Sequence, residues 1–307
     1  MKRVLVVYFS QTGQLRRVVD ALLGPLRSSG EFQVTTVALQ PLAPYPFPWS
    51  FWSFFNTFPE CMQDDPGPIA ALPLSPDADF DLVVLAYQVW FLSPSLPMTA
   101  FLQSDQARQL LAGKPVVTLI ACRNMWLMAQ ERVKAHLRRL GAHLIDNVAL
   151  TDRTHGAKTV ITTPWWLLSG NKGPYLGGLL PVAGVSDADI AAAARFGQAI
   201  AAEFPRRAPD DLRPMLGGLG AVVIHTGLIA SEQLVQRSLR LWSILLRRCG
   251  RPSAPLRRFV LALYVLFLVV MLLTAVPIVF TLRTLLAPLS RRRVVRLREY
   301  FAAPSGE

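Results

Sequence analysis

Cysteine and histidine are scarce in this chain, which has three of the first and four of the second in 307 residues. Cys61, Cys122 and Cys249 are far apart, odd in number and form no Cys-x-x-Cys pair. A disulfide framework and a structural zinc site are therefore excluded, because both need paired or clustered ligands. We expect no resident metal ion.

Two nucleotide-binding signatures are also missing. The chain has no Gly-x-x-x-x-Gly-Lys-Ser/Thr, and no Gly-x-Gly-x-x-Gly follows a predicted strand. The Gly-rich segment 217–220 has Val223 where the third glycine would stand, so we interpret it as an apolar turn. No signal peptide is visible either, since Met1 leads through Lys2 and Arg3 into a predicted strand. We therefore expect the N-terminal domain to fold in the cytoplasm.

Acidic side chains are rare in the last third of the chain. Residues 1–205 carry 16 basic and 15 acidic side chains, whereas residues 206–307 carry 16 basic and 5 acidic ones. Almost the whole net charge of +12 thus lies in the C-terminal part. This asymmetry indicates contact with a polyanion, either nucleic acid or anionic lipid.

Charge is absent altogether from residues 259–282, a run of 24 mostly apolar side chains. As a helix this run would be about 36 Å long, against a hydrocarbon core of about 30 Å. We therefore expect a membrane segment, with an anionic membrane lipid surface as partner. Nucleic acid is not expected, because the arginines flank the apolar run and do not alternate with aromatic stacking residues.

The flanks of this segment leave its topology open. Five arginines lie between residues 247 and 258, and six lie between residues 283 and 298. A single transmembrane helix would place six arginines outside, against the positive-inside tendency, so a re-entrant or in-plane element is the alternative. Residues 231–248 have one apolar and one arginine-rich side, which is typical of an interfacial helix. An ordinary helix packed on the globular domain would show the same pattern.

What the chain does contain is an alternation of apolar strands and helical patterns. The predicted strands cover residues 4–9, 32–39, 81–87, 115–121 and 144–150. Helical spacing follows most of them, and an alanine-rich helix is predicted over 187–204. This order predicts an α/β fold with a doubly wound parallel five-stranded sheet over residues 1–205.

Two regions depart from that alternation. Residues 41–76 contain nine prolines and a dense aromatic tract, and we expect an irregular insert there. It is either a lid over an apolar substrate, a membrane-facing collar, or a self-packed surface. The C-terminal extension is predicted as an amphipathic helical linker over 206–258, the hydrophobic segment 259–282, and a basic tail over 283–307.

The turn after the first strand has the chemistry of a phosphate cradle. Its residues are Ser10, Gln11, Thr12, Gly13, Gln14 and Leu15. Backbone N–H groups and the positive end of the following helix attract an anion there, and the hydroxyl groups add donors.

Two further loops follow the third and fourth predicted strands. Because ligands of such sheets bind at the carboxyl ends of the strands, near a switch in strand order, all three loops are candidate site elements. The second loop contains Gln88, Val89, Trp90 and Phe91. The third contains Cys122, Arg123, Asn124, Met125 and Trp126.

Several segments together resemble a bacterial group of flavodoxin-like proteins known as dialkylresorcinol condensing enzymes. They are Val-Val-Tyr-Phe-Ser-Gln-Thr-Gly-Gln-Leu (6–15), Tyr-Pro-Phe-Pro-Trp (45–49), Phe-Phe-Asn-Thr-Phe-Pro-Glu (54–60), Val-Trp-Phe-Leu-Ser-Pro-Ser (89–95), Cys-Arg-Asn-Met-Trp (122–126) and the closing Pro-Ser-Gly (304–306). The resemblance implies a flavodoxin-like fold and FMN as cofactor. The first loop would bind the FMN phosphate, and the second and third would meet the isoalloxazine. It also implies a role beside aromatic lipid synthesis, where the flavoprotein aromatises a cyclohexanedione ring. The ketosynthase nucleophile that the group's name would imply is not found.

Two residues depart from the usual flavodoxin pattern. Leu15 stands where such loops often carry a hydroxyl residue, which removes one phosphate donor. Arg123 is cationic where electron carriers have acidic groups. Near the flavin pyrimidine it would stabilise the anionic reduced form and favour taking hydride from a substrate. The alternative is that Arg123 pairs with a carboxylate such as Glu131.

Two more side chains are candidates for chemistry. Cys122 at a helix start is either an activated nucleophile or a small packing residue. His155 follows the fifth predicted strand and is either an acid or base toward substrate or an ordinary loop histidine. We thus name Arg123 and His155 as candidate catalytic residues.

These observations predict a membrane-associated FMN-dependent oxidoreductase with a cytoplasmic catalytic domain. Its substrate would be apolar, quinone-like or a cyclic dione, with a dialkylresorcinol precursor as the candidate that the resemblance implies, and a biosynthetic synthase is a candidate partner. The alternatives are a non-catalytic membrane scaffold for such synthases, a nicotinamide-dependent quinone reductase, or an electron carrier.

Overall fold

The fold is described from a computed structural model of the whole chain. The backbone is described for all residues except 76, 153–155, 209 and 307. Side chains are described for these same residues apart from 156, 157, 159, 160, 272 and 275–291. The predicted candidate His155 lies outside the described residues.

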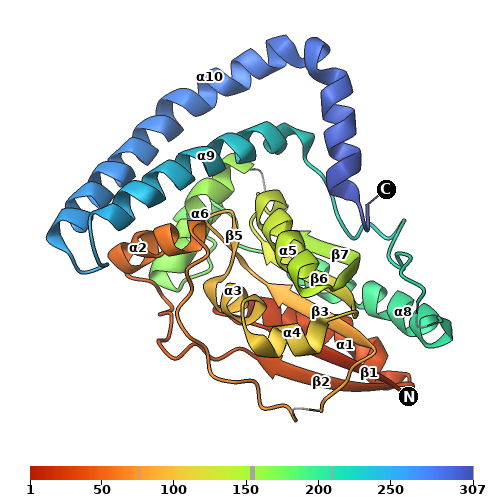
Figure 1. Ribbon diagram of the computed structural model, residues 1–307. Coiled ribbons are helices and arrows are strands. Elements are labelled where there is room, and N and C mark those ends of the chain that lie inside the picture. Colours follow the sequence, from red (N-terminus) through yellow and green to blue (C-terminus); the bar gives the residue numbers. More distant parts are fainter. Residues whose placement is uncertain (76, 153–155, 209, 307) are drawn as a thin grey trace.

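A five-stranded parallel sheet forms the centre of the molecule (Figure 1). Its strands are β1 (Lys2–Tyr8), β2 (Phe32–Ala38), β3 (Leu82–Tyr87), β6 (Pro115–Cys122) and β7 (His143–Thr151). They lie in the order β2-β1-β3-β6-β7, and every pairing is parallel. This is the 2-1-3-4-5 order of the flavodoxin-like doubly wound fold, with the switch in strand order between β1 and β3. The predicted fold class and all five predicted strands are confirmed.

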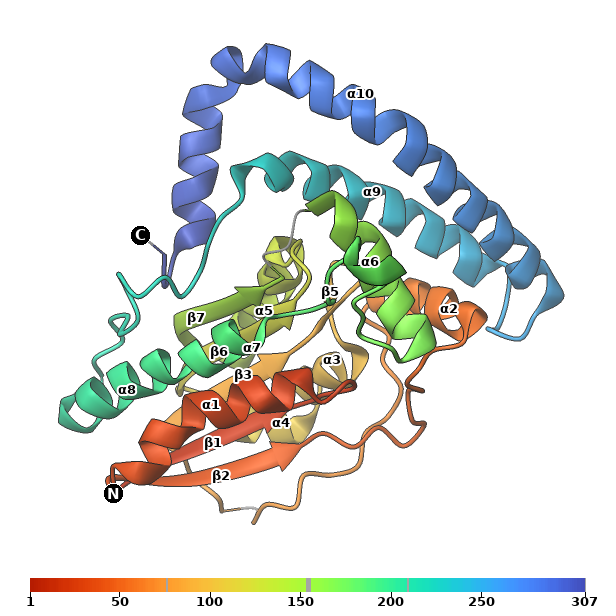
Figure 2. The same ribbon diagram turned by 180° about the vertical axis from the view of Figure 1, so that it is seen from behind.

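The strands bury both faces, because helices cover each side of the sheet (Figure 2). Alternate strand residues enter two separate cores, so that Leu5 and Val7 lie in one and Val4 and Val6 in the other. Helices α1 (Gln14–Ser28), α7 (Asp187–Ala192) and α8 (Ala194–Glu203) cover one face. Helices α3 (Leu96–Leu102), α4 (Asp105–Leu111) and α5 (Leu127–Leu140) cover the other.

One helix occurs in the insert, where irregular chain was predicted, and another in a segment for which no helix was predicted. The insert contains α2 (Phe51–Met62), in which Phe58, Cys61 and Met62 are buried. It begins at Ser50, whose hydroxyl oxygen accepts a hydrogen bond from the amide of Ser53 at 3.2 Å, and this N-cap outweighs the surrounding prolines. The second, α6 (Gly156–Ser169), lies over the carboxyl ends of the strands. The prolines of the insert led to the prediction of irregular chain there, and Pro59 lies inside α2, as Pro164 lies inside α6.

The remaining elements are short, apart from two long helices at the C-terminus. A hairpin of β4 (Val89–Trp90) and β5 (Ser93–Pro94) follows β3, and the 3₁₀ turns are η1 (Leu176–Gly178) and η2 (Phe204–Arg206). Residues 217–220 form a turn, as predicted. Helices α9 (Thr226–Arg248) and α10 (Pro255–Ala302) run side by side from their common turn, after which α10 arches away and bends back toward the sheet (Figure 1).

The predicted membrane-spanning helix over 259–282 is not supported. These residues belong to α10, and among the described residues no helix is long and apolar enough to cross a bilayer. The side chains at 272 and 275–282 lie outside that description.

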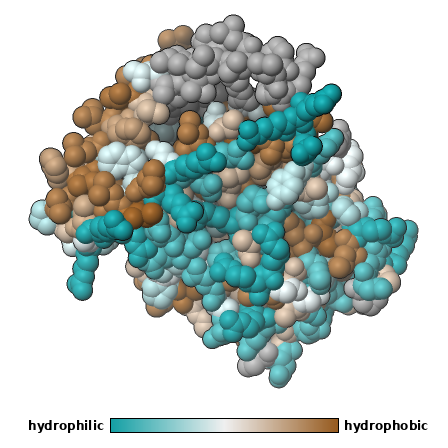
Figure 3. Space-filling view, turned by 45° about the horizontal axis from the view of Figure 1, so that its top comes forward, coloured by the Kyte–Doolittle hydropathy of each residue, from teal (hydrophilic) through white to brown (hydrophobic). Residues whose placement is uncertain are grey.

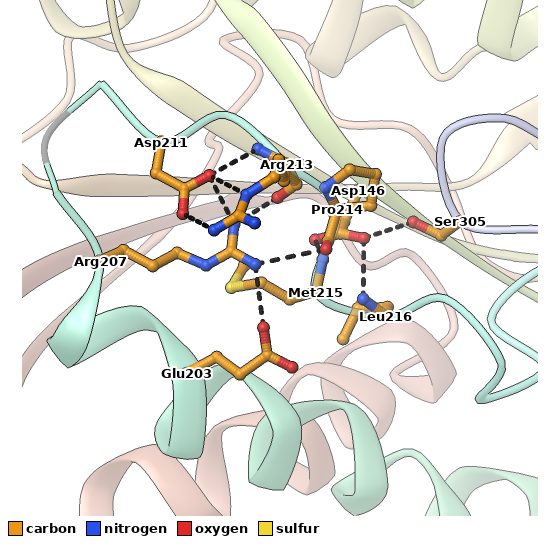
Figure 4. A network of polar contacts seen from close by, with 9 residues as sticks. All are labelled: Asp146, Glu203, Arg207, Asp211, Arg213, Pro214, Met215, Leu216 and Ser305. Carbon is orange, nitrogen blue, oxygen red and sulfur yellow. Dashed lines mark hydrogen bonds and ion pairs between the residues drawn. The ribbon is translucent and has the colours of Figure 1, made fainter.

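The C-terminal end of the chain is bound to the sheet (Figure 4). The Ser305 hydroxyl donates to a carboxylate oxygen of buried Asp146 on β7 at 2.6 Å, and accepts from the amide of Asn147 at 2.9 Å. The same carboxylate accepts the amides of Met215 and Leu216 at 2.9 and 3.1 Å. Burial raises the pKa of Asp146, and these hydrogen bonds partly offset that effect. One buried carboxylate thus joins the last residues of the chain to the segment between α8 and α9.

Candidate functional site

The three predicted loops lie at the carboxyl ends of three neighbouring strands, β1, β3 and β6. Parts of all three line one cavity of about 90 Å³. The first loop contributes Gln11, Thr12, Gln14 and Leu15, the second Gln88, Val89 and Trp90, and the third Cys122 and Arg123, preceded by Ala121. The sheet topology therefore brings together the loops that the sequence pointed to.

The first loop forms a tight turn at the start of α1. Gly13 is the N-cap, with φ of 79°, a conformation that a side chain would strain. The hydroxyl oxygens of Ser10 and Thr12 accept the amides of Arg16 at 3.2 Å and Gln14 at 3.4 Å. Within the described hydrogen bonds, the amides of Thr12, Gly13 and Leu15 donate to no acceptor. These three N–H groups at a helix N-terminus form a nest that suits an anion.

Two side chains of this loop hold its position. The Gln14 amide nitrogen donates to the carbonyl of Val185 at 3.1 Å, and its oxygen accepts the Val185 amide, also at 3.1 Å. The Gln11 side chain donates to the carbonyl of Pro46 at 2.8 Å. Leu15 is buried in the core, so only its backbone can meet a ligand. The turn is thus tied both to the insert and to the segment before α7.

The two aromatic residues of the second loop lie in different surroundings, Trp90 at the cavity and Phe91 against α2. The Trp90 ring lines the cavity and is supported edge-on by Phe9, Tyr45 and Trp49, at centroid distances of 5.8, 5.0 and 5.5 Å. Phe91, with φ of 49°, packs against two phenylalanines of α2 and is absent from the cavity lining. The aromatic insert therefore supports the second loop from behind.

The third loop is divided between two cavities. Cys122 and Arg123 line the larger one, and Asn124, Met125 and Trp126 line a second, of about 10 Å³. The loop residues that the sequence grouped together thus face two different spaces.

The structure favours the packing role for Cys122. Its thiol makes a long contact of 3.8 Å with the carbonyl oxygen of Asn124. Burial raises the pKa of the thiol, and nearby Glu232 raises it further, while Arg123 lowers it. A nucleophile needs the opposite shift, so these surroundings do not activate the thiol and favour the packing role.

Arg123 faces the larger cavity. Its Nε donates to the side-chain oxygen of Asn124 at 3.3 Å. The alternative partner Glu131 instead bonds Lys134 at 3.0 Å and the hydroxyl of Tyr300 at 2.8 Å. Burial lowers the pKa of Arg123, which is the expected effect of desolvating a cation. A cation held in this way favours negative charge on a ligand in the cavity.

Helix α6 supplies a wall that the sequence did not predict. Thr163, Trp166 and Leu167 line the cavity, together with Gly184. The Thr163 hydroxyl is buried without a hydrogen-bond partner among the described residues. A Cβ on Gly184 would lie within 2.9 Å of Gln14 and Trp166. The adjacent aromatic pair Trp165-Trp166 is the local signal in the sequence that could have pointed to this wall.

The residues present fit a ligand with an anionic tail and a flat ring. The N–H nest would hold the tail, the two tryptophans offer ring surfaces, and Arg123 and the free Thr163 hydroxyl offer polar contacts. The cavity is smaller than the roughly 300–1,000 Å³ of pockets that enclose a whole small molecule. A ligand as large as FMN therefore has to extend out of its mouth or displace a side chain.

The second cavity contains a buried carboxyl group that sequence reasoning missed. Glu232 of α9 is fully buried, and one of its oxygens accepts the amide of Met128, in the first turn of α5, at 2.7 Å. The other oxygen has no partner among the described residues. Burial raises the pKa of Glu232 to about 7. The sequence did offer a signal for this buried carboxyl group, because Glu232 is a single acidic residue in an otherwise basic amphipathic helix.

Comparison with known proteins finds no matching family profile and no matching curated protein. Solved structures do match. A flavoprotein in complex with FMN from Lactobacillus acidophilus NCFM aligns over 48% of this chain and 93% of its own, with 14% identity and a TM-score of 0.40. A flavodoxin from the domain Archaea covers 67% of this chain and 99% of its own, at 12% identity and a TM-score of 0.36. Flavodoxin 1 from Bacillus cereus covers 55% and 99%, at 13% identity and a TM-score of 0.31. The order of the five parallel strands identifies the fold as flavodoxin-like.

Proposed function

We propose that this protein is an FMN-dependent oxidoreductase that acts on an apolar quinone-like or cyclic-dione substrate. The observation that carries the proposal is the convergence of three loops on one cavity at the switch point of the sheet. The N–H groups of Thr12, Gly13 and Leu15 would hold the phosphate, and Trp90 and Trp166 would flank the ring. When bound, FMN supplies two-electron oxidation and reduction.

Arg123 supports oxidation of a substrate over delivery of electrons at low potential. Its positive charge lies in a cavity where desolvation strengthens electrostatic interactions. The cation would stabilise negative charge that develops on a reduced ring and thereby raise the potential. Conversion of an alkylated cyclohexane-1,3-dione to the corresponding resorcinol removes two electrons and two protons, which is the change this site would promote. A dialkylresorcinol precursor and a partner synthase belong to this proposal through the resemblance of the motifs.

The small cavity favours a second candidate. A flavodoxin-like scaffold that binds partner synthases without redox chemistry would need no room for a cofactor, and about 90 Å³ is little room. Titration of the purified full-length protein with FMN separates the two functions, because quenching of flavin fluorescence reports binding. A scaffold would leave the fluorescence unchanged.

The redox proposal has a sharper test in the potential of the bound flavin. The Arg123→Met variant should lower the midpoint potential by roughly 30 mV or more, about 1.4 kcal/mol for a two-electron couple. Arg138→Met, on the exposed side of α5, is the matched control and should leave the potential unchanged. Anaerobic addition of a dialkyl cyclohexane-1,3-dione should bleach the flavin of the parent protein. Bound flavin with equal potentials in both variants would contradict the role given to Arg123.

A further inference from the structure

The first half of α10 has two apolar faces, of which only one is packed. Arg257, Leu261 and Tyr264 are buried against α2 and α9. On the opposite side, a stripe recurs at spacings of three and four residues, with exposed fractions of 44–70%: Leu256, Phe259, Leu263, Leu266, Val270 and Leu273. This stripe spans about 26 Å of helix. Six large apolar side chains in one line are more than an ordinary water-exposed helix displays.

Neighbouring helices extend this apolar surface. On α9, Leu234, Leu241 and Leu245 are exposed, while Glu232, Leu239 and Leu246 are buried. On α2, which packs against α9, Phe51 and Trp52 are exposed as well. Apolar side chains gather over the side of the molecule where α2 and the α9–α10 turn lie (Figure 3). We call these eleven exposed side chains of α2, α9 and α10 the apolar face.

Past Glu232, every charged side chain that α9 and α10 bring beside the apolar face, up to Glu299, is an arginine. The chain has no Asp or Glu between Glu232 and Glu299. Arg248, Arg251 and Arg258 are exposed near the α9–α10 turn, and within the described residues no ion pair joins them. Arg247, by contrast, pairs with Asp65 of the segment after α2 at 2.6 Å. The partner of this surface must therefore combine an apolar interior with negative charge at its boundary.

Both ends of α10 are attached to the α/β body. At its start, the Arg257 guanidinium contacts both carboxylate oxygens of Glu60 at 2.8 Å, and Arg257 is only 2% exposed. At its end, Ser305 bonds Asp146 and Asn147 of β7. A helix tied at both ends to one body presents its side and not its tip (Figure 1).

We propose that the apolar face lies in the plane of an anionic lipid bilayer, with its aliphatic and aromatic side chains among the acyl chains. The unpaired arginines would contact anionic headgroups at the rim. An anionic bilayer has an apolar interior bounded by negatively charged headgroups. It therefore complements a surface of apolar side chains bordered by arginines. The surface proposal is independent of the redox chemistry.

The test is flotation of the full-length protein with lipid vesicles in a density gradient. The parent chain should float with vesicles of phosphatidylcholine containing about a third phosphatidylglycerol, and less with phosphatidylcholine alone. Raising the salt concentration should weaken the first binding, because headgroup contacts are screened. The variant Phe259→Ser, Leu263→Ser, Leu266→Ser should lose at least about tenfold of its vesicle partition, since three inserted apolar side chains are removed.

Matched controls make the result specific. Leu42, Leu176 and Leu179 are as exposed as the stripe residues but lie outside it, and their triple change to Ser should leave flotation unchanged. Arg248→Gln, Arg251→Gln, Arg258→Gln should abolish the preference for anionic vesicles. Circular dichroism and urea unfolding check that each variant folds.

Two outcomes would overturn the proposal. One is absence of the parent chain from the floating fraction with both vesicle types. The other is a dimer in light scattering that the stripe variant alone dissociates, since the apolar face would then cover a second copy of the chain. Loss of FMN binding with flotation intact would instead count only against the proposed redox function.

Discussion

Helices α1 and α10 are both rich in apolar side chains, but the large ones of α1 are buried and many of those of α10 are exposed. In α1 the large apolar residues recur on one side, and its six leucines and valines are all buried: Leu15, Val18, Val19, Leu22, Leu23 and Leu26. In α10 they occur all around the helix, so packing one side leaves the other exposed. Apolar content therefore does not determine burial. The spacing of the apolar residues determines which side of a helix one packed element can bury. Apolar residues on the other sides stay exposed unless a second element or partner covers them.

The largest effect is expected at the anchor of α10. Arg257→Met should lower the free energy of unfolding by about 3–5 kcal/mol, because Glu60 would keep a partly buried charge without its partner. Urea denaturation measures the change. Arg258→Met, one position along and exposed, is the control and should change stability by less than about 0.5 kcal/mol. Equal effects of the two changes would show that α10 is not held by this ion pair.

A second large effect concerns Glu232, which connects α9 to α5. Its pKa is raised to about 7 from 4.5, so the folded protein favours the protonated form. The contribution of Glu232 to stability should be greatest below about pH 4.5, fall as the pH rises toward 7, and level off above it, a loss on the order of 3 kcal/mol. Glu232→Gln should remove this slope in urea denaturation series at several pH values. An unchanged slope would mean that Glu232 is ionised throughout.

The tight packing of α1 predicts the next effect. A Cβ at Gly197 of α8 would overlap the backbone oxygen of Leu22, so Gly197→Ala should destabilise by about 1–3 kcal/mol or more. Gly24 of α1 has no atom within 4 Å of its Cβ position, and Gly24→Ala should stabilise by about 0.4–1 kcal/mol. Thermal and urea unfolding compare the two. If neither substitution lowers stability, α8 does not pack against α1 as closely as the structure shows, and the prediction is wrong.

The smallest effect is expected on the exposed stripe of α10. Leu266→Ser should change the stability of the lipid-free chain by no more than about 0.5 kcal/mol, because the side chain is 60% exposed. Leu22→Ala on α1 should cost about 2–5 kcal/mol in the same urea series, since that side chain is fully buried. A large loss of stability for Leu266→Ser would show that the stripe packs against another part of the folded protein.

The three loops of the cavity were predicted from the sequence, but its opposite wall was not. Strand ends and the Thr12-Gly13 turn are local features, and they correctly brought Gln88 and Arg123 to one cavity. The helix of the opposite wall was not predicted, because Thr163 and Trp166 lie on a helix with weak amphipathic spacing and an internal proline. The burial of Glu232 was equally hidden, since it depends on α9 packing against the start of α5.

The sequence by itself determined the five parallel strands and the three loops that follow them, because buried strands and one-sided helices are encoded by short-range periodicity. It also determined the charge asymmetry and the long uncharged run. Only the tertiary structure decided that α10 is tied at both ends, that the aromatic insert supports Trp90, and which apolar side chains remain exposed. Those outcomes depend on contacts between residues far apart in the chain, such as Arg257 with Glu60 and Ser305 with Asp146, which no local pattern records.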